Sequence, residues 1–210
     1  MTIARARLAL PAPELAPRLL GAVVTTRIDG AEVALRLTEV EAYEGLDDPA
    51  SHAYRGCTPR TAVMFGPPGH LYCYFTYGMH WCANIVCDVD GRASAVLLRA
   101  GEVVRGHELA GHRRPSARKP VELARGPARL ARCLGLGREQ NGADLCDRAS
   151  PVQLGALPRR HGRISTGPRV GISMAAERPW RFWLEGEPSV SAFRPGGRKR
   201  AAGNRQTDAP

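Results

Sequence analysis

The chain has 210 residues, 43% of them hydrophobic, and its 30 lysines and arginines against 20 aspartates and glutamates give a formal charge of +10 at pH 7. This length predicts one domain with a hydrophobic core, and the absence of any run of about 18 apolar residues excludes a membrane-spanning helix. The charge indicates a polyanionic partner, of which nucleic acid is the commonest, although the arginine-rich and alanine-rich composition that a GC-rich genome produces would give the same excess.

Strands dominate the first half of the predicted fold. A short helix over residues 14–20 ends at Gly21, and the turn Asp29-Gly30 predicts a hairpin. A short helix or turn is expected over residues 47–55 and a proline-rich loop over residues 58–68. The segments with strand-like composition in this half are residues 22–27, 32–43, 71–76, 81–87 and 94–99.

The second half begins with a basic segment. Residues 101–120 are polar and basic, and their early part, 102–112, predicts a helix. A solvated surface loop and a contact with phosphates are both open interpretations of this segment. Residues 126–135 predict a second helix, because Pro127 lies in its first turn and Gly135 just past its end. Late strands are expected over residues 152–154, 169–173 and 181–184.

Many strands with hairpin-like connections, and few helices, favour an α+β fold. We expect a single domain over residues 1–193, built around a curved, open-barrel-like antiparallel sheet with peripheral helices and a protruding β-hairpin. Residues 194–210 are rich in glycine, proline and arginine, which predicts a basic, disordered tail. Its Arg198-Lys199-Arg200 run could touch DNA weakly.

The cysteines and histidines show no metal-binding pattern. None of the six cysteines forms a C-x-x-C pair and no histidine completes a zinc-ligand spacing, so neither a metal nor another cofactor is expected. Cys73, Cys82 and Cys87 lie in apolar segments and are expected to be buried free thiols. The N-terminus lacks the apolar stretch of a signal peptide, which predicts a cytoplasmic, nucleoid-associated or nuclear protein.

Two glutamates near the end of the second predicted strand are candidates for chemistry. Residues two apart on a strand point to one face, so Glu39, Glu41 and Tyr43 are expected to leave the same side of the sheet. Leu35 and Leu37 precede them at the same spacing, which predicts that this face begins in the core. A carboxylate where a core face opens to a cleft is a candidate general base, although a solvent-facing acidic edge has the same spacing.

The segment Tyr77-Gly78-Met79 lies between two strongly strand-like segments and predicts a hairpin tip. A tyrosine folded back on the sheet is the common interpretation of such a tip. The functional one is a wedge of Tyr77 and Met79 in a DNA stack, because an enzyme that acts on a base must extrude it. The nearby aromatic residues, on which an extruded purine could stack, are Tyr43, Tyr72, Tyr74 and Trp81.

Nine motifs follow one another along the chain: Thr38-Glu39-Val40-Glu41-Ala42-Tyr43, Ser51-His52, Thr58-Pro59-Arg60, Met64-Phe65, residues 69–79, Asn84-Ile85, residues 96–100, residues 126–130 and Arg169-Val170-Gly171. Together they resemble the alkyladenine (3-methyladenine) DNA glycosylase family. The resemblance covers about residues 10 to 192, in order and with few gaps. Taken together the motifs are much more specific than any one alone.

The resemblance implies a role for three catalytic groups. Glu41 resembles the carboxylate that deprotonates the attacking water. Arg99 resembles the arginine that helps to hold that water, and the backbone carbonyl of Val170 is a third contact. The resemblance thereby chooses between Glu39 and Glu41, which strand spacing alone leaves open.

The resemblance also implies a base pocket. Tyr43 and His52 resemble the pair whose faces enclose the extruded base, Tyr74 completes the aromatic wall, and the backbone N–H of His52 would read the base edge. Asn84 resembles the residue that obstructs the 2-amino group of undamaged guanine, and Tyr77 resembles the intercalating wedge. The segment His80-Trp81-Cys82-Ala83 departs from the bulkier residues of the family pattern, which bears on the pocket floor and the lesion range.

The implied enzyme is a monomeric, monofunctional glycosylase that extrudes damaged purines from double-stranded DNA, hydrolyses the N-glycosidic bond and leaves an abasic site. The expected substrates are 3-methyladenine and 7-methylguanine, with hypoxanthine and ethenoadenine as further candidates. The pocket motifs contain no lysine, which argues against Schiff-base and strand-nicking chemistry. The alternatives are a non-catalytic nucleic-acid-binding module, a hydrolase of free nucleosides and a structural β-domain.

Overall fold

The strand-like segments pair into one antiparallel sheet, in a computed structural model that describes residues 2–76, 78–159 and 162–196. Its strands are β1 (Val23–Ile28), β2 (Ala31–Glu44), β3 (Leu71–Thr76), β4 (His80–Cys87), β5 (Ser94–Arg105), β6 (Val152–Leu154), β7 (Ile164–Gly167) and β8 (Arg181–Leu184). The α-helices are α1 (Ala12–Leu19), α2 (His107–Arg113) and α3 (Pro127–Leu134). Single turns of 3-10 helix are found at Arg5–Arg7, Gly45–Asp47, Ala62–Phe65, Pro120–Glu122 and Arg138–Gln140.

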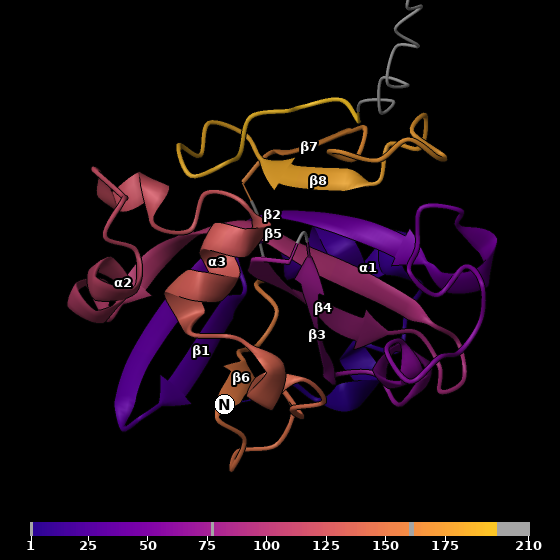
Figure 1. Cartoon of the computed structure of the whole chain (residues 1–210), viewed down its shortest axis with the longest axis horizontal. Helices are drawn as coiled ribbons and strands as arrows, with labels where there is room; N and C mark the ends of the chain where they lie inside the picture. The colour runs from indigo at the N-terminus through magenta and orange to yellow at the C-terminus, as the bar shows by residue number, and fades with distance from the viewer. Residues whose placement is uncertain (1, 77, 160–161, 197–210) are drawn as a thin grey trace, which may run out of the picture.

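The sheet is open and curled, with the strand order β3-β4-β5-β2-β1-β6 (Figure 1). β2 has 14 residues and reaches two partners along one edge, because its first part pairs with β1 and its segment Glu39–Glu41 pairs with β8. β5 pairs with the other edge of β2, and β7 pairs with the outer edge of β8. The predicted α+β fold around a curved antiparallel sheet is therefore confirmed.

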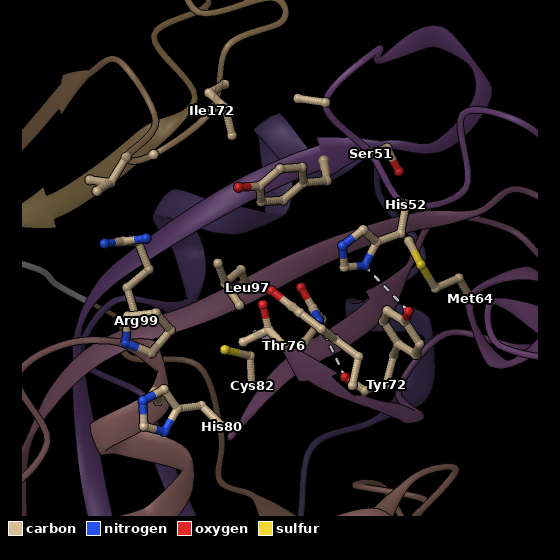
Figure 2. A pocket seen from close by; sticks show the side chains of 18 residues that line it. Ser51, His52, Met64, Tyr72, Thr76, His80, Cys82, Leu97, Arg99 and Ile172 are labelled. Carbon is tan, nitrogen blue, oxygen red and sulfur yellow. Dashed lines mark hydrogen bonds between the residues drawn. The ribbon is translucent and has the colours of Figure 1, made fainter. Parts of the chain in front are cut away.

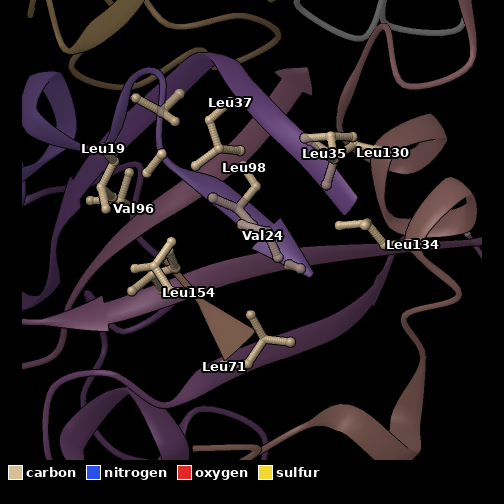
Figure 3. Packing of buried hydrophobic residues seen from close by; sticks show 14 of the residues in the cluster. Leu19, Val24, Leu35, Leu37, Leu71, Val96, Leu98, Leu130, Leu134 and Leu154 are labelled. Carbon is tan, nitrogen blue, oxygen red and sulfur yellow. The ribbon is translucent and has the colours of Figure 1, made fainter. Parts of the chain in front are cut away.

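One face of the sheet carries the hydrophobic core (Figure 3). Leu15 and Leu19 of α1 are fully buried in it, as are Leu130 and Leu134 of α3. Each such leucine stabilises the fold by roughly 1.5–3 kcal/mol through burial. Helices and side chains fill this face, whereas the opposite face opens to a cavity.

Strand alternation separates the two faces. On β4, Ala83 and Ile85 point into the core, whereas Cys82 and Asn84 line a cavity on the opposite face. Successive side chains of a strand point to opposite sides, so β4 contributes side chains to both the core and the cavity. The nearly continuous apolar character of β4 follows from this.

A bulge at Thr38 reverses the faces of β2. The pairing of β2 with β5 skips Thr38 on one strand and Arg99 on the other. An inserted residue moves every later side chain to the opposite face. The prediction that Glu39 and Glu41 continue the face of Leu37 is therefore wrong, because Leu37 lies in the core and the carboxylates point away from it. The prediction that Glu39, Glu41 and Tyr43 share a face is confirmed.

The helix predicted over residues 102–112 is wrong in its first part. β5 continues to Arg105 and α2 begins at His107. Gly101 lies inside β5, where a Cβ would clash with the side chain of Leu35 and the carbonyl oxygen of Arg36. The glycine allows the two strands to approach closely, and its poor strand propensity hid the continuation of β5.

The strand predicted over residues 169–173 is also wrong. This segment is a turn after β7, and Gly171 has a positive φ of 74°. The N–H of Val170 donates to the side chain of Glu41 rather than to a neighbouring strand. The predicted helix over residues 126–135 is confirmed as α3, which ends on Gly135 at a φ of 74°.

Several other expectations concern features away from the site. Cys73, Cys82 and Cys87 are free and buried, as predicted. Among the described residues, no helix is long and apolar enough to cross a membrane, and no group of three or more His, Cys, Asp or Glu side chains is placed to hold a metal ion. Residues 197–210 lie outside the described residues, and the domain boundary at residue 193 stays a prediction.

Candidate active site

A cavity of about 300 Å³ opens on the face of the sheet opposite the core. Alternate residues of β3, β4, β5 and β2 form its walls, together with residues 50–52, Met64, the turn at residues 170–172 and the start of α3. In the view of Figure 2, His52 and Tyr72 stand at one side of the cavity and Arg99 and His80 at the other. The polar and aromatic wall residues predicted for the site are Tyr43, His52, Tyr74, Asn84 and Arg99.

Glu41 is fully buried directly behind the cavity wall. Its Oε1 accepts the N–H of Val170 at 2.6 Å, and its Oε2 accepts the hydroxyl of Tyr43 at 2.9 Å and Nη1 of Arg99 at 3.2 Å. All three donor residues line the cavity. The carboxylate therefore lies one group away from whatever the cavity holds.

Glu39 is equally buried but is held by a different set of donors. Its Oε1 accepts Nε of Arg99 at 2.8 Å and Nε of Arg181 at 2.7 Å. The backbone N–H and the hydroxyl of Ser191 complete its bonds at 2.7 and 2.9 Å. Glu39 does not line the cavity, so its position is that of an anchor for Arg99, which in turn bonds to Glu41.

The two carboxyl groups have opposite electrostatic settings. Burial raises the pKa of Glu41 above its ordinary value, although the charge of Arg99 and the bonds from Val170 and Tyr43 oppose it. Burial also raises the pKa of Glu39, but Arg99, the N–H of Ser191 and Arg181 outweigh it and leave that pKa lowered. A general base works best with a pKa near the working pH, so Glu41 is the better suited of the two.

Aromatic rings form the wall across from Arg99. The ring of His52 meets that of Tyr74 edge-on at a centroid distance of 4.5 Å, and Tyr72 stacks on Tyr74 at 5.6 Å. The hydroxyl of Tyr72 lies 3.3 Å from Nδ1 of His52 (Figure 2). Burial against these rings and the positive charge of Arg60 lower the pKa of His52, so its ring is neutral at pH 7. A planar, neutral, aromatic wall suits stacking of a purine.

Asn84 lies at the floor of the cavity. It is 5% exposed, and its Nδ2 donates to the carbonyl oxygen of Tyr72 at 3.2 Å, which fixes the orientation of the amide. His80 and Cys82, from the segment that departs from the family pattern, line the same cavity. Trp81, expected with the aromatic cluster, packs instead against the hydrophobic core.

The pair of Arg169 and Asp48 supports the site, and the sequence analysis missed it. Arg169 is 1% exposed and bonds to Asp48 through both Nη atoms. Its guanidinium lies 4.6 Å from the ring centroid of Tyr43 and also donates to the carbonyl oxygen of Ala42. The pair thus fixes Tyr43 on one side and the adjacent N–H of Val170 on the other. A charged residue within an apparent strand was the only available signal.

The hairpin between β3 and β4 carries the predicted wedge. Met79 is 66% exposed, and Phe75 nearby is 46% exposed. Tyr77 lies outside the described residues. An exposed apolar hairpin is compatible with insertion between bases.

The setting of Glu39 leads to a prediction about stability. Glu39→Gln removes the charge that neutralises two buried arginines, Arg99 and Arg181, so we expect a loss of about 3–5 kcal/mol in the free energy of unfolding. Urea denaturation measures it. The matched control is Glu102→Gln, whose carboxylate pairs with Arg36 at the surface and should cost no more than about 1 kcal/mol. Equal losses in the two variants would contradict the anchoring role of Glu39.

A buried carboxylate behind an aromatic cavity, in a chain of charge +10, suits a hydrolase that acts on a base of nucleic acid. Residues 6–188 match the model of the methylpurine-DNA glycosylase family, and the chain belongs to that family. It is a DNA glycosylase, a hydrolase of N-glycosyl bonds that serves base excision repair of damaged DNA.

Relatives from several bacteria agree with the family match. The chain is 52% identical over 189 residues to a protein of Streptomyces avermitilis, with 89% of each chain covered. It is 56% identical over 190 residues to one of Leifsonia xyli, which covers 86% of this chain and 87% of the relative. It is 49% identical over 201 residues to a protein of Mycobacterium tuberculosis, and the match covers 93% of this chain and 96% of the relative. Each of these relatives bears the name "Putative 3-methyladenine DNA glycosylase".

Proposed function

We propose that this enzyme removes alkylated purines, above all 3-methyladenine and 7-methylguanine, from double-stranded DNA by hydrolysis with a water that Glu41 activates. The observation that carries the proposal is the position of Glu41, whose three hydrogen-bond donors all line the cavity. The names of the bacterial relatives support the same substrate class. One cavity in one chain is sufficient for this chemistry, so we propose a monomer.

The base reaches the cavity by extrusion from the duplex. An enzyme that acts on the bond between base and sugar must unstack the nucleotide, which costs a few kcal/mol. Stacking on aromatic rings returns about 1–3 kcal/mol per base, and Tyr43, His52 and Tyr74 supply these rings. In the proposal, Tyr77 and Met79 enter the gap left in the stack. Asn84 at the cavity floor excludes the 2-amino group of undamaged guanine.

Glu41 performs the proton transfer in the proposed reaction. The carboxylate takes a proton from water as the C–N bond breaks, water oxygen bonds to the sugar carbon, and the base leaves with the bonding electrons. The negative charge of Glu41 also stabilises the positive charge that develops on the sugar. The attacking water is proposed to lie where Arg99, Tyr43 and Val170 converge, with the carbonyl of Val170 as one of its partners.

The charge of the leaving base decides how much help it needs. A purine alkylated at N3 or N7 carries a positive charge and leaves as a neutral molecule, so one carboxylate suffices. Hypoxanthine and ethenoadenine are neutral and need a proton or a hydrogen bond in the pocket. We therefore expect faster release of the alkylated purines than of these two.

The test measures base release from duplexes that each carry one lesion: 3-methyladenine, 7-methylguanine, hypoxanthine or ethenoadenine. An undamaged duplex and free N7-methylguanosine are the controls. Release from the lesion duplexes with intact strands and an abasic product supports the proposal. Release from the nucleoside alone would support a nucleoside hydrolase instead, and strand cleavage would contradict the monofunctional mechanism.

A further inference from the structure

Three arginines gather beside the base cavity. Arg114 directly follows α2, and Arg129 and Arg132 lie on α3, three residues apart and so on one side of the helix. These three residues, named here the arginine cluster, line a hollow of about 250 Å³ together with His80, Ser116 and Ala128. Figure 1 shows α2 and α3 side by side at one end of the sheet.

The arginine cluster forms no ion pair in the described part of the chain. The buried arginines of the sheet and its flanking turn are each paired with a carboxylate, as Arg169 is with Asp48. Within residues 2–76, 78–159 and 162–196, no carboxylate forms an ion pair with Arg114, Arg129 or Arg132. Arg114 is 8% exposed and donates through Nε to the carbonyl oxygen of Leu123.

The charges of the cluster act on one another. Burial lowers the pKa of Arg114, and the positive charges of Arg129 and Arg132 lower it further. Glu122 shares a neighbouring hollow with Arg114 and Arg129. Its carboxylate accepts the backbone N–H of Arg118, which lowers its pKa, and the charge of Arg129 helps to lower that pKa. Glu122 forms no ion pair with either arginine of that hollow. Three arginines near one carboxylate leave an excess of positive charge at the hollow, which attracts anions, and the arginine guanidinium suits phosphate oxygens in particular.

The hollow of the arginine cluster adjoins the base cavity. His80 and Ala128 line both of them. A third hollow, lined by Met79, Arg113 and Arg132, continues from there toward the hairpin that carries the predicted wedge. The surface formed by the arginine cluster and Arg113 therefore extends from the base cavity to the hairpin between β3 and β4. Only one sugar separates a base from its phosphate. With the extruded base in the cavity, the phosphates of that nucleotide and its neighbours would therefore lie close to this surface.

We propose that the arginine cluster binds phosphodiester groups of the damaged strand on either side of the extruded nucleotide. This inference rests on the proposed function. Within the basic segment of residues 101–120, which the sequence left between a solvated loop and a phosphate contact, it assigns a phosphate contact to Arg114 alone. Phosphate contacts fix the position of a strand but carry no sequence information. The cluster therefore strengthens binding to damaged and undamaged duplexes alike.

The test is the double variant Arg129→Gln/Arg132→Gln, whose two side chains are exposed on α3. Binding to an undamaged duplex is measured by fluorescence anisotropy over a series of salt concentrations. Each lost phosphate contact lowers the slope of log affinity against log salt by about 0.9, so the slope should fall by about 2. Affinity at fixed salt should fall about 10-fold. Arg129→Lys/Arg132→Lys keeps the charges and should retain most of the slope.

The matched control is Arg7→Gln/Arg18→Gln, which removes the same charge from exposed positions in the first 3-10 turn and in α1. If the cluster variant and this control have the same affinity and slope, the inference is overturned. Single-turnover base release separates the inference from the proposed function. Release of 3-methyladenine by the cluster variant at saturating enzyme would show that the chemistry of the cavity survives the loss of affinity. A wild type that shows the salt slope but releases no base would contradict the proposed function and leave the phosphate site standing.

Discussion

Glu41→Gln is expected to lower the rate of base release about 10²–10⁴-fold, the usual contribution of a general base. Glutamine matches the shape of glutamate but cannot take a proton from water. Its carbonyl oxygen can still accept the N–H of Val170, and the hydroxyl of Tyr43 can turn to accept from the new amide. Arg99 loses its bond to residue 41 but keeps its bond to Glu39. The cavity should therefore keep its form while the chemistry stops. Single-turnover release of 3-methyladenine from a duplex measures the loss.

Binding is the control for this variant. The affinity of Glu41→Gln for a duplex with an abasic-site analogue should stay within a few-fold of the wild type, because Glu41 lies behind the wall and does not line the cavity. A variant that binds normally and releases base at a rate within 10-fold of the wild type would remove Glu41 from the catalytic role. Loss of binding together with loss of rate would indicate a misfolded cavity, which near-UV circular dichroism detects.

The sequence could predict which side chains take part in this site. Glu41, Tyr43, His52, Tyr74, Asn84 and Arg99 were all named by the family resemblance, and the structure brings them around or directly behind one cavity. Strand periodicity alone could not do this. It put the carboxylates on the core face, because it cannot detect that Thr38 is skipped in the pairing of β2. A bulge leaves no local composition signal when its residues also suit a strand.

Long-range pairs set the other limit on prediction. Arg169 and Asp48 are 121 residues apart, and each alone has the pattern of a strand or a turn residue. Only the folded chain brings the guanidinium over the ring of Tyr43. The late segment at residues 169–173 was predicted as a strand for the same reason, since the partner of the Val170 N–H is a side chain from β2 rather than a neighbouring strand.

Arg99→Met is expected to impair base release strongly at neutral pH and to move its pH dependence. Arg99 is the largest influence that lowers the pKa of Glu41, against burial. Without it that pKa rises further. Glu41 must be deprotonated to accept a proton, so the wild-type rate falls as the pH drops through the pKa of Glu41. The acidic limb of the pH–rate profile should lie at higher pH in Arg99→Met, because a larger share of Glu41 is protonated at each pH.

Recovery at high pH distinguishes this effect from the loss of the base itself. Part of the Arg99→Met activity should return as the pH rises, whereas Glu41→Gln should stay inactive at every pH. Arg99→Lys keeps a positive charge but cannot bond to Glu39 and Glu41 with one planar fork, so its limb should lie between those of the wild type and Arg99→Met. A limb of Arg99→Met that coincides with the wild type would mean that Arg99 does not tune Glu41. Arg99 would then serve the site only by holding the attacking water, and its loss would lower the rate equally at all pH values.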